Sequence, residues 1–142
     1  MSDQCIFCEI LAGRIPSNIV YQNESVTAIM DIMPVNPGHV LLITNEHFTN
    51  ALDANPDVMA EVGKMITPLA NAVKLGMNAE GIGLHQLNGA AAGQTVFHYH
   101  MHFIPQNTGE SFDMHGRTLG DFEEIAANCE VIKLVLNKAE AI

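Results

Sequence analysis

Basic residues are scarce in this chain and absent from a long central stretch. The 142 residues include 6 Lys and Arg against 16 Asp and Glu, a formal net charge of −10, and no cation lies between Lys74 and Arg117. Binding of nucleic acid through its phosphates needs a basic surface that releases counterions. The charge therefore excludes a nucleic-acid partner. A phosphate bound within residues 75–116 must be held by backbone N–H groups, hydroxyls, amides and imidazoles.

Long apolar runs and a cysteine framework are also missing. No run approaches the roughly 20 residues of a membrane helix, and residues 1–4 lack the features of a secretory signal. The cysteine count of 3 is odd, which favours thiol or metal roles over disulfides. We therefore expect a cytoplasmic protein with no membrane partner. Its length and its 48% hydrophobic content fit a single domain over residues 1–142.

Hydrophobic periodicity predicts an α+β fold. The pattern indicates a short helix over 5–12 and strands over 19–21, 26–32, 39–44, 81–87 and 98–104, with Asp31 on the second strand and His39 opening the third. A main helix should begin after Asn55 and end at Gly76, with a kink at Pro68. We expect an antiparallel sheet of about five strands in a core over 5–106.

A second long helix is expected in the C-terminal extension, residues 107–142. Asp121 and Glu124 form a capping box at its start. Its buried face should carry Phe122, Ile125, Cys129, Ile132 and Leu136. Cys129 is thus assigned to the core.

Three histidines alternate with apolar residues at His98, His100 and His102. Alternate side chains of a strand share one face, so the imidazoles should be rooted roughly 6 to 7 Å apart, close enough to surround one phosphate or one metal. Hydrogen-bonded structural histidines are the simplest alternative, but each buried ring then needs its own partner. Strict alternation of three favours a site.

Two kinds of site fit the three imidazoles: a metal site, or a nucleophilic site in which a neutral imidazole attacks an electrophile. The preceding loop over residues 88–95 offers glycines, an amide and a hydroxyl suited to phosphate oxygens, although such loops are also typical of plain surface turns. This loop favours the nucleophile. Asp31 by itself fits a solvated carboxylate, and Cys5 with Cys8 fits a redox pair, a metal site or apolar packing.

The sequence resembles the histidine-triad family, whose signature is His-φ-His-φ-His-φ-φ with φ apolar. The matching residues are His98-Tyr99-His100-Met101-His102-Phe103-Ile104. Further matches are Ile6-Phe7-Cys8-Glu9-Ile10, Ile15-Pro16, Met30-Asp31-Ile32, Pro37-Gly38-His39, Asn88 and Gly93-Gln94-Thr95. The resemblance covers most of residues 5–106 and fades beyond Gln106. The absence of Trp and the tail from Asn107 depart from the eukaryotic phosphoramidase pattern.

The resemblance implies a small nucleotide as substrate and His100 as the nucleophile. His100 would attack the α-phosphorus, and water would hydrolyse the nucleotidyl-histidine to release a nucleoside monophosphate. His98 and a backbone carbonyl would orient the ring. The phosphate and leaving group would be contacted, without any Lys or Arg, by His102, His39, Gly93, Gln94 and Thr95. Asp31 would bind the ribose, and Asn88 would lie near the sugar and phosphate. The base would occupy an apolar slot formed by Phe7, Ile15 and Ile32.

Purine nucleoside phosphoramidates such as adenylyl-amines are the first substrates expected, with dinucleoside polyphosphates as the close alternative. His102 in place of the Gln of the transferase branch favours water as acceptor. A competing hypothesis is a non-catalytic nucleotide-binding or zinc-stabilised interaction module.

The resemblance also implies a metal and a partner. Cys5, Cys8, His47 and His98 would hold a structural zinc in a closed tetrahedral shell. The chemistry itself would need no cofactor. The family commonly forms two-fold dimers, so we expect a homodimer with an extended sheet.

Overall fold

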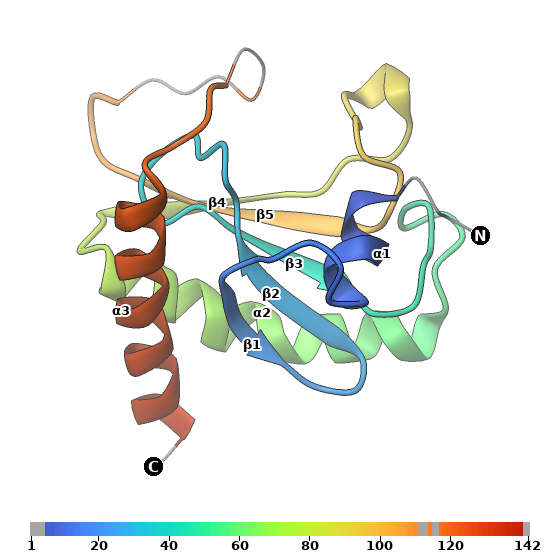
Figure 1. Cartoon of the computed structure of the whole chain (residues 1–142), viewed down its shortest axis with the longest axis horizontal. Helices are drawn as coiled ribbons and strands as arrows, with labels where there is room; N and C mark the ends of the chain where they lie inside the picture. The colour runs from blue at the N-terminus through green and yellow to red at the C-terminus, as the bar shows by residue number, and fades with distance from the viewer. Residues whose placement is uncertain (1–4, 111–113, 115–116, 141–142) are drawn as a thin grey trace.

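The protein is described by a computed structural model that covers residues 5–110, 114 and 117–140. Figure 1 shows the elements in chain order: α1 (Ile6–Leu11), β1 (Ile19–Gln22), β2 (Val26–Met30), β3 (Val40–Thr44), α2 (Pro56–Gly76), β4 (Gly81–His85), a 3-10 turn (Ala90–Ala92), β5 (His100–Gln106) and α3 (Phe122–Glu140). The α+β architecture is the one predicted. Over the described residues, no helix combines the length and apolar character that a membrane crossing requires.

The sheet is antiparallel, with five strands in the order β1-β2-β3-β5-β4. β3 is central, as predicted, and every residue of β2 and β3 is buried. The register between β3 and β5 places His100 opposite Ile43 and His102 opposite Leu41. The two histidines therefore lie over the middle of the sheet.

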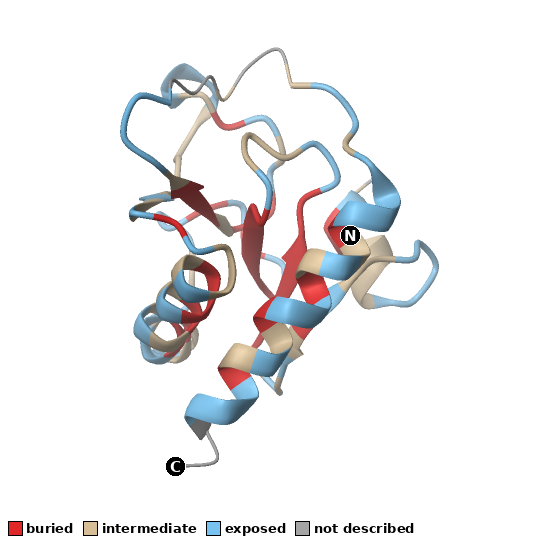
Figure 2. Ribbon diagram, turned by 90° about the vertical axis from the view of Figure 1, so that its left-hand side faces the viewer, coloured by how far each residue is buried: buried red, intermediate tan, exposed pale blue. Residues whose placement is uncertain are grey.

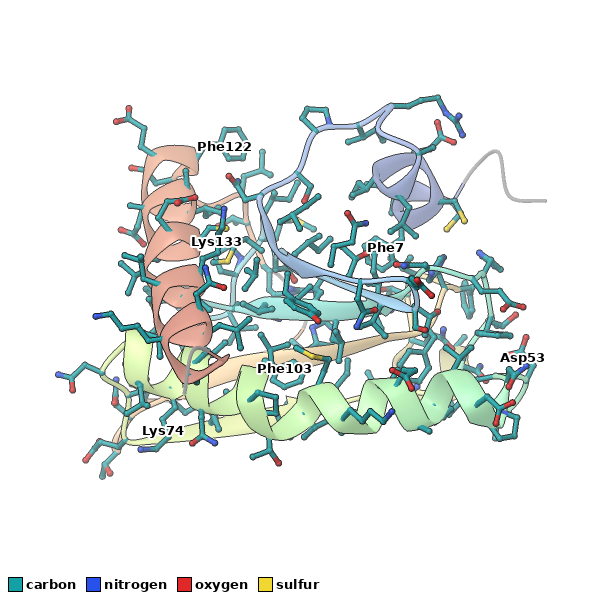
Figure 3. The ribbon with its side chains drawn as sticks, turned by 90° about the horizontal axis from the view of Figure 1, so that it is seen from below. Phe7, Asp53, Lys74, Phe103, Phe122 and Lys133 are labelled. Carbon is teal, nitrogen blue, oxygen red and sulfur yellow. The ribbon has the colours of Figure 1, made fainter. Side chains whose placement is uncertain are left out.

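The two faces of the sheet carry different helices. Figure 2 shows that the central strands are buried, and Figure 3 shows them between α1 on one side and the long α2 on the other, with α3 at one end of the molecule. Phe103 belongs to the core that α2 and α3 cover, together with Leu69 and Ile132. Phe7 packs on the opposite face with Leu41 and Ile43. Alternation along β5 thus sends Phe103 into the main core and His100 and His102 to the α1 side.

Both long helices begin at side-chain caps. The Asn55 carboxamide oxygen accepts the Asp57 N–H at 2.7 Å, and α2 continues through Pro68 as one helix to Gly76. Asp121 accepts the N–H groups of Glu123 and Glu124 at 2.9 and 3.3 Å.

The prediction for α3 was correct at four of five core positions. Ile125, Cys129, Ile132 and Leu136 are buried, whereas Phe122 is 60% exposed. Figure 3 shows Phe122 at the outer end of α3. As the first residue of the helix it precedes the turn that packs on the core, so its assignment to the buried face was wrong.

Several strand ends differ from the prediction by one or two residues. β2 ends at Met30, so Asp31 follows the strand, and β5 begins at His100, so His98 precedes it. The Asp31 N–H donates to the His39 carbonyl at 3.0 Å, just before β3 begins.

Candidate functional site

The three histidines of the motif divide between two places. The rings of His100 and His102 lie on the α1 side of the sheet with centroids 5.1 Å apart. The ring of His98 instead packs against His47, with centroids at 4.7 Å, and its Nε2 lies 2.7 Å from the Thr44 carbonyl oxygen. The expectation from strand alternation that all three imidazoles share one face is wrong for His98, which precedes β5 and lies beside His47, as in the zinc set that the resemblance implied. Two adjacent sites result.

His100 is held as a neutral ring with one nitrogen available. Its Nδ1 lies 2.7 Å from the carbonyl oxygen of His98, and a carbonyl can only accept, so Nδ1 carries the proton. Nε2 then carries a lone pair. Burial lowers the pKa of His100, and the hydrogen bond to the His98 carbonyl opposes that shift. The arrangement suits a nucleophilic nitrogen, and His98 orients the ring through its backbone.

A second backbone contact fixes the tautomers of His39 and His102. The Val35 N–H donates to His39 Nδ1 at 3.0 Å, which places the His39 proton on Nε2. That nitrogen lies 2.9 Å from His102 Nδ1 and 3.5 Å from Asp31 Oδ2. Burial lowers the pKa of His39 to about 4 and that of His102 to about 2. His102 is therefore neutral and carries its proton on Nε2, as a hydrogen-bond donor beside His100.

Two cavities meet at His100. The wide cavity, about 190 Å³, is mostly apolar and includes Phe7, Ile15, Asp31, Ile32, Thr95, His100 and His102 in its lining. The narrow cavity, about 20 Å³, is lined by Leu87, Gly93, Gln94, Thr95, His100, His102, Met114 and Arg117. The Phe7 ring meets His100 edge-on with centroids 5.1 Å apart. The structure thus gathers the residues predicted for the base and ribose in one cavity and those of the glycine-rich loop in the other.

His39 and Asn88 lie away from both cavities. His39 is fully buried behind His102. The Asn88 carboxamide oxygen instead accepts the Ala51 N–H at 2.8 Å and a Gln86 N–H at 2.8 Å. Direct contact of these two side chains with a phosphate or ribose, as the resemblance implied, does not fit their positions. His39 supports His102, and Asn88 holds the chain that precedes the glycine-rich loop.

The Gln94 side chain is buried and already bonded. Its oxygen accepts the Gly89 N–H at 2.8 Å, and its NH₂ group donates to the carbonyls of Thr49 at 2.7 Å and Val96 at 3.0 Å. These bonds hold the two ends of the glycine-rich loop together. Gln94 therefore shapes the narrow cavity more than it offers donors to it.

Arg117 is the residue that sequence reasoning missed. Its Nη1 lies 2.7 Å from Asp31 Oδ2 and 2.8 Å from the Met33 carbonyl oxygen, and its side chain lines both cavities. The expectation of a site without Lys or Arg is wrong. The only signal in the sequence was that Arg117 is the single cation between Lys74 and Lys133.

The predicted zinc residues form a compact cluster. Cys5 Sγ lies 3.3 Å from His98 Nδ1, and Cys8 Sγ lies 3.3 Å from His47 Nδ1 and 3.6 Å from His98 Nδ1. All four ligand atoms lie within 4.8 Å of one another. Tetrahedral zinc with Zn–S of about 2.3 Å and Zn–N of about 2.0 Å gives an S···N edge of about 3.5 Å. The four side chains fit that metal.

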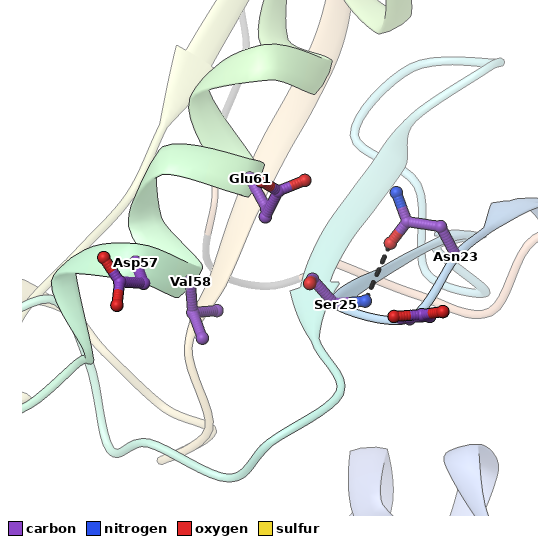
Figure 4. A pocket seen from close by; sticks show the side chains of 6 residues that line it. Asn23, Ser25, Asp57, Val58 and Glu61 are labelled. Atoms are coloured by element: carbon purple, nitrogen blue, oxygen red, sulfur yellow. Dashed lines mark hydrogen bonds between the residues drawn. The ribbon is translucent and has the colours of Figure 1, made fainter.

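A larger cavity lies elsewhere and has the wrong charge for a nucleotide. It measures about 550 Å³, lies between the β1–β2 turn and the start of α2, and is lined by Asn23, Glu24, Ser25, Asp57, Val58 and Glu61 (Figure 4). Three of these residues are carboxylates, which repel phosphate. Imidazoles are absent from this lining within the part of the chain that the structure describes.

Comparisons with known proteins agree on one family. The model of the HIT domain matches residues 12–109. The protein hit of Bacillus subtilis is 40% identical over 123 residues, which cover 84% of this chain and 83% of that protein. A histidine triad nucleotide-binding protein of Sulfolobus tokodaii superposes with a TM-score of 0.88 at 31% identity, covering 96% of this chain and 94% of the other.

A zinc-bound relative has the same fold. The Zn-bound histidine triad family protein of Mycobacterium smegmatis superposes with a TM-score of 0.87 at 29% identity, and the match covers 99% of each chain. The domain match, the relatives and the alternating histidines agree, and the chain belongs to the histidine triad (HIT) family.

Proposed function

We propose that this protein is a nucleotide hydrolase that attacks the α-phosphorus of purine nucleoside phosphoramidates, such as adenylyl-amines, through a nucleotidyl-histidine on His100. The observation that carries the proposal is the 2.7 Å contact of His100 Nδ1 with the His98 carbonyl oxygen. It leaves the Nε2 lone pair on a neutral ring at the meeting point of the two cavities. The other groups at the site support this reaction.

The wide cavity suits the nucleoside. The apolar side chains of Phe7, Ile15 and Ile32 offer burial to a base but few hydrogen bonds that discriminate between bases. The carboxylate of Asp31 can accept hydrogen bonds from ribose hydroxyls at the same cavity. A nucleoside bound in this way would have its α-phosphate beside His100.

The reaction has two displacements. In the first, the Nε2 lone pair of His100 bonds to phosphorus, and the bond to the amine breaks as the amine leaves with the electron pair and takes one proton from solvent. In the second, water bonds to phosphorus and releases one proton to solvent, and the bond to Nε2 breaks. The Nε2–H of His102 donates a hydrogen bond to phosphate oxygen in both displacements. His100 regains its lone pair, and the nucleoside monophosphate is released.

A second candidate substrate class is the dinucleoside polyphosphates. Here the leaving group is a phosphate oxygen rather than an amine nitrogen. The guanidinium of Arg117 at the narrow cavity favours such an anionic leaving group. Both classes use the same nucleophile.

The cysteine and histidine cluster is proposed to hold a structural zinc. Its residues are Cys5, Cys8, His47 and His98, whose S···N spacings match a tetrahedral shell. Such a metal ties α1 to the residues before β5. It supplies no step of the reaction but stabilises the backbone that presents the His98 carbonyl to His100.

Trapping of the covalent intermediate tests the function. The native protein, His100→Ala and the control His85→Ala are mixed with adenosine phosphoramidate labelled at phosphorus and quenched in denaturant. We expect label on the native chain and on the control, whose imidazole lines neither cavity, and none on His100→Ala. Equal labelling of all three chains would place the nucleophile at a residue other than His100, and absence of label from all three would favour a non-catalytic binding module.

A further inference from the structure

One cation of the chain reaches the nucleotide site. Of the six Lys and Arg residues, Arg117 alone appears among the described residues that line the cavities at His100. Its side chain is 17% exposed and that of Asp31 is 8% exposed. A cation this enclosed interacts with a ligand far more strongly than an exposed one does.

The guanidinium is held in a fixed plane. Nη1 donates to Asp31 Oδ2 at 2.7 Å and to the Met33 carbonyl at 2.8 Å, and Nε donates to the Met114 carbonyl at 3.1 Å. A guanidinium has five N–H groups in a rigid fork. Within the described part of the chain, these bonds leave both N–H groups of Nη2 without a protein acceptor. Nη2 is thus a positioned donor that a ligand can use at little entropic cost.

No carboxylate is among the described residues that line the narrow cavity, and the Asp31 carboxylate that pairs with Arg117 at 2.7 Å lies on the side of the wide cavity. The described lining of the narrow cavity is neutral except for Arg117: Leu87, Gly93, Gln94, Thr95, His100, His102 and Met114. In a chain with a formal net charge of −10, this cavity is therefore a local site that favours an anion.

The placement of the substrate makes this charge relevant to the reaction. With the nucleoside in the wide cavity and the α-phosphorus at His100, the group attached beyond that phosphorus faces the narrow cavity, whose lining includes Arg117. Negative charge develops on the leaving atom as its bond to phosphorus breaks, and a fixed guanidinium stabilises that charge.

We propose that Arg117 is a specificity-determining residue that selects substrates whose leaving group is an anion, such as a phosphate or a sulfate, over those that release a neutral amine. The inference rests on the proposed function, because it takes His100 as the point of attack, and of the two substrate classes proposed above it favours the dinucleoside polyphosphates over the phosphoramidates. The rival role for Arg117 is structural neutralisation of Asp31. That role predicts that replacing Arg117 lowers affinity and kcat/KM by the same factor for every substrate.

Binding is measured first, because it does not depend on turnover. Dissociation constants for adenosine 5′-monophosphate and adenosine 5′-diphosphate are determined by calorimetry for the native protein, Arg117→Gln, Arg117→Lys and Lys64→Gln. The β-phosphate of the diphosphate stands in for an anionic leaving group. Lys64 is a matched control for the lost charge, since it lies on the surface of α2 in a pair with Glu61.

We expect the native protein to prefer the diphosphate. Arg117→Gln should reduce that preference by roughly tenfold or more, the scale of lost hydrogen bonds to a charged group. Arg117→Lys should retain part of it, because an ammonium keeps the charge but not the fork. Lys64→Gln should leave it unchanged. The ratio of kcat/KM for adenylyl sulfate to that for adenosine phosphoramidate should follow the same order.

An equal loss for both nucleotides, or no change in their ratio, would overturn the proposal. Thermal unfolding shows whether each variant is folded. If Arg117→Gln does not fold, Arg117→Lys supplies the ratio of the dissociation constants for the two nucleotides. Failure of the native protein to bind either nucleotide would overturn both this proposal and the proposed function. If the ratio shifts while no label is trapped on His100, the nucleophile is wrong and the selection of anions by Arg117 stands.

Discussion

His39 Nε2 lies 2.9 Å from His102 Nδ1, and this contact determines which nitrogen of His102 carries its proton. The Val35 N–H bonded to His39 Nδ1 at 3.0 Å forces the His39 proton onto Nε2. His102 must then accept at Nδ1 and donate from Nε2. A backbone amide four residues before His39 thereby sets the protonation pattern of a ring at the cavities.

Loss of His39 should slow turnover without weakening substrate binding. His39→Phe removes the donor to His102 Nδ1, so we expect kcat to fall by roughly 10- to 100-fold, the scale of lost outer-shell partners, while KM changes little. His39→Gln should restore much of kcat, because its amide can accept from Val35 and donate to His102. Steady-state kinetics on both variants decide this. Similar losses in the two would mean that the site requires the shape of an imidazole at this position and that the proton pattern is irrelevant.

Much of the fold was predictable because its causes are local. The cap at Asn55, the helical periodicity of α2 and the alternation around His100 are each set within a few residues. Strand ends were less predictable. Whether Asp31 or His98 belongs to a strand depends on pairing with a segment elsewhere in the chain, and sequence periodicity carries no information about that partner.

The site was predictable where a motif specified it. His100 and Asp31 were identified by spacing and resemblance, whereas Arg117 was not, although it bonds Asp31 across 86 positions of sequence. The contact of Arg117 with the cavities depends on tertiary packing, which no hydrophobic periodicity of the sequence predicts. Strand alternation alone did not predict the direction of the His98 ring, which Cys5 and the Thr44 carbonyl determine, whereas the zinc set implied by the resemblance did place His98 beside the cysteines.

Asp31 should recognise the ribose hydroxyls. Its Oδ1 accepts the Met33 N–H at 2.8 Å, and Oδ2 faces Arg117 and His39 at the wide cavity. We expect Asp31→Asn to weaken binding of adenosine 5′-monophosphate by roughly 10-fold or more, the scale of lost hydrogen bonds to a charged group. The 2′,3′-dideoxy analogue should bind both proteins equally. Calorimetry with the two nucleotides tests this, and an equal loss for the dideoxy analogue would assign Asp31 a structural role only.

Acid should destabilise the fold over a range set by His39. Burial lowers its pKa to about 4 in the folded chain, against about 6.5 when unfolded. Between these pH values the unfolded chain binds a proton that the native chain does not. The free energy of unfolding is therefore highest above pH 6.5 and decreases as the pH falls toward 4. Burial also lowers the pKa of His102, so this residue adds to the loss of stability in acid.

Urea unfolding between pH 7.5 and 5 measures this effect, because most carboxylates titrate at lower pH. The free energy of unfolding should fall with pH in the native protein. In His39→Gln the slope should be shallower. An identical slope in the two proteins would assign the effect to other groups.

The metal cluster should bind one zinc per chain. Cys8→Ala removes a sulfur atom that lies 3.3 Å from His47 Nδ1, and we expect this variant to lose the metal and its Tm to fall by about 5 °C or more. Cys129→Ala, in the buried face of α3, should keep the metal. Elemental analysis of the purified proteins gives the stoichiometry. Retention of a full equivalent of zinc by Cys8→Ala would place the metal elsewhere.

The remaining expectation concerns the outer strand of the sheet. Among the described strands β4 pairs only with β5, and Leu84 on β4 is 41% exposed. An unpaired edge with an exposed apolar side chain favours association with a second copy. We predict a dimer with twice the 15.4 kDa mass of the chain in sedimentation.

Leu84→Glu should raise the dimer dissociation constant by about tenfold or more, since a charge buried at the interface costs at least about 1.4 kcal/mol. Leu134→Glu, which changes an exposed leucine of α3, is the control. A monomeric native protein would exclude the dimer, and equal dissociation of the two variants would place the interface away from β4.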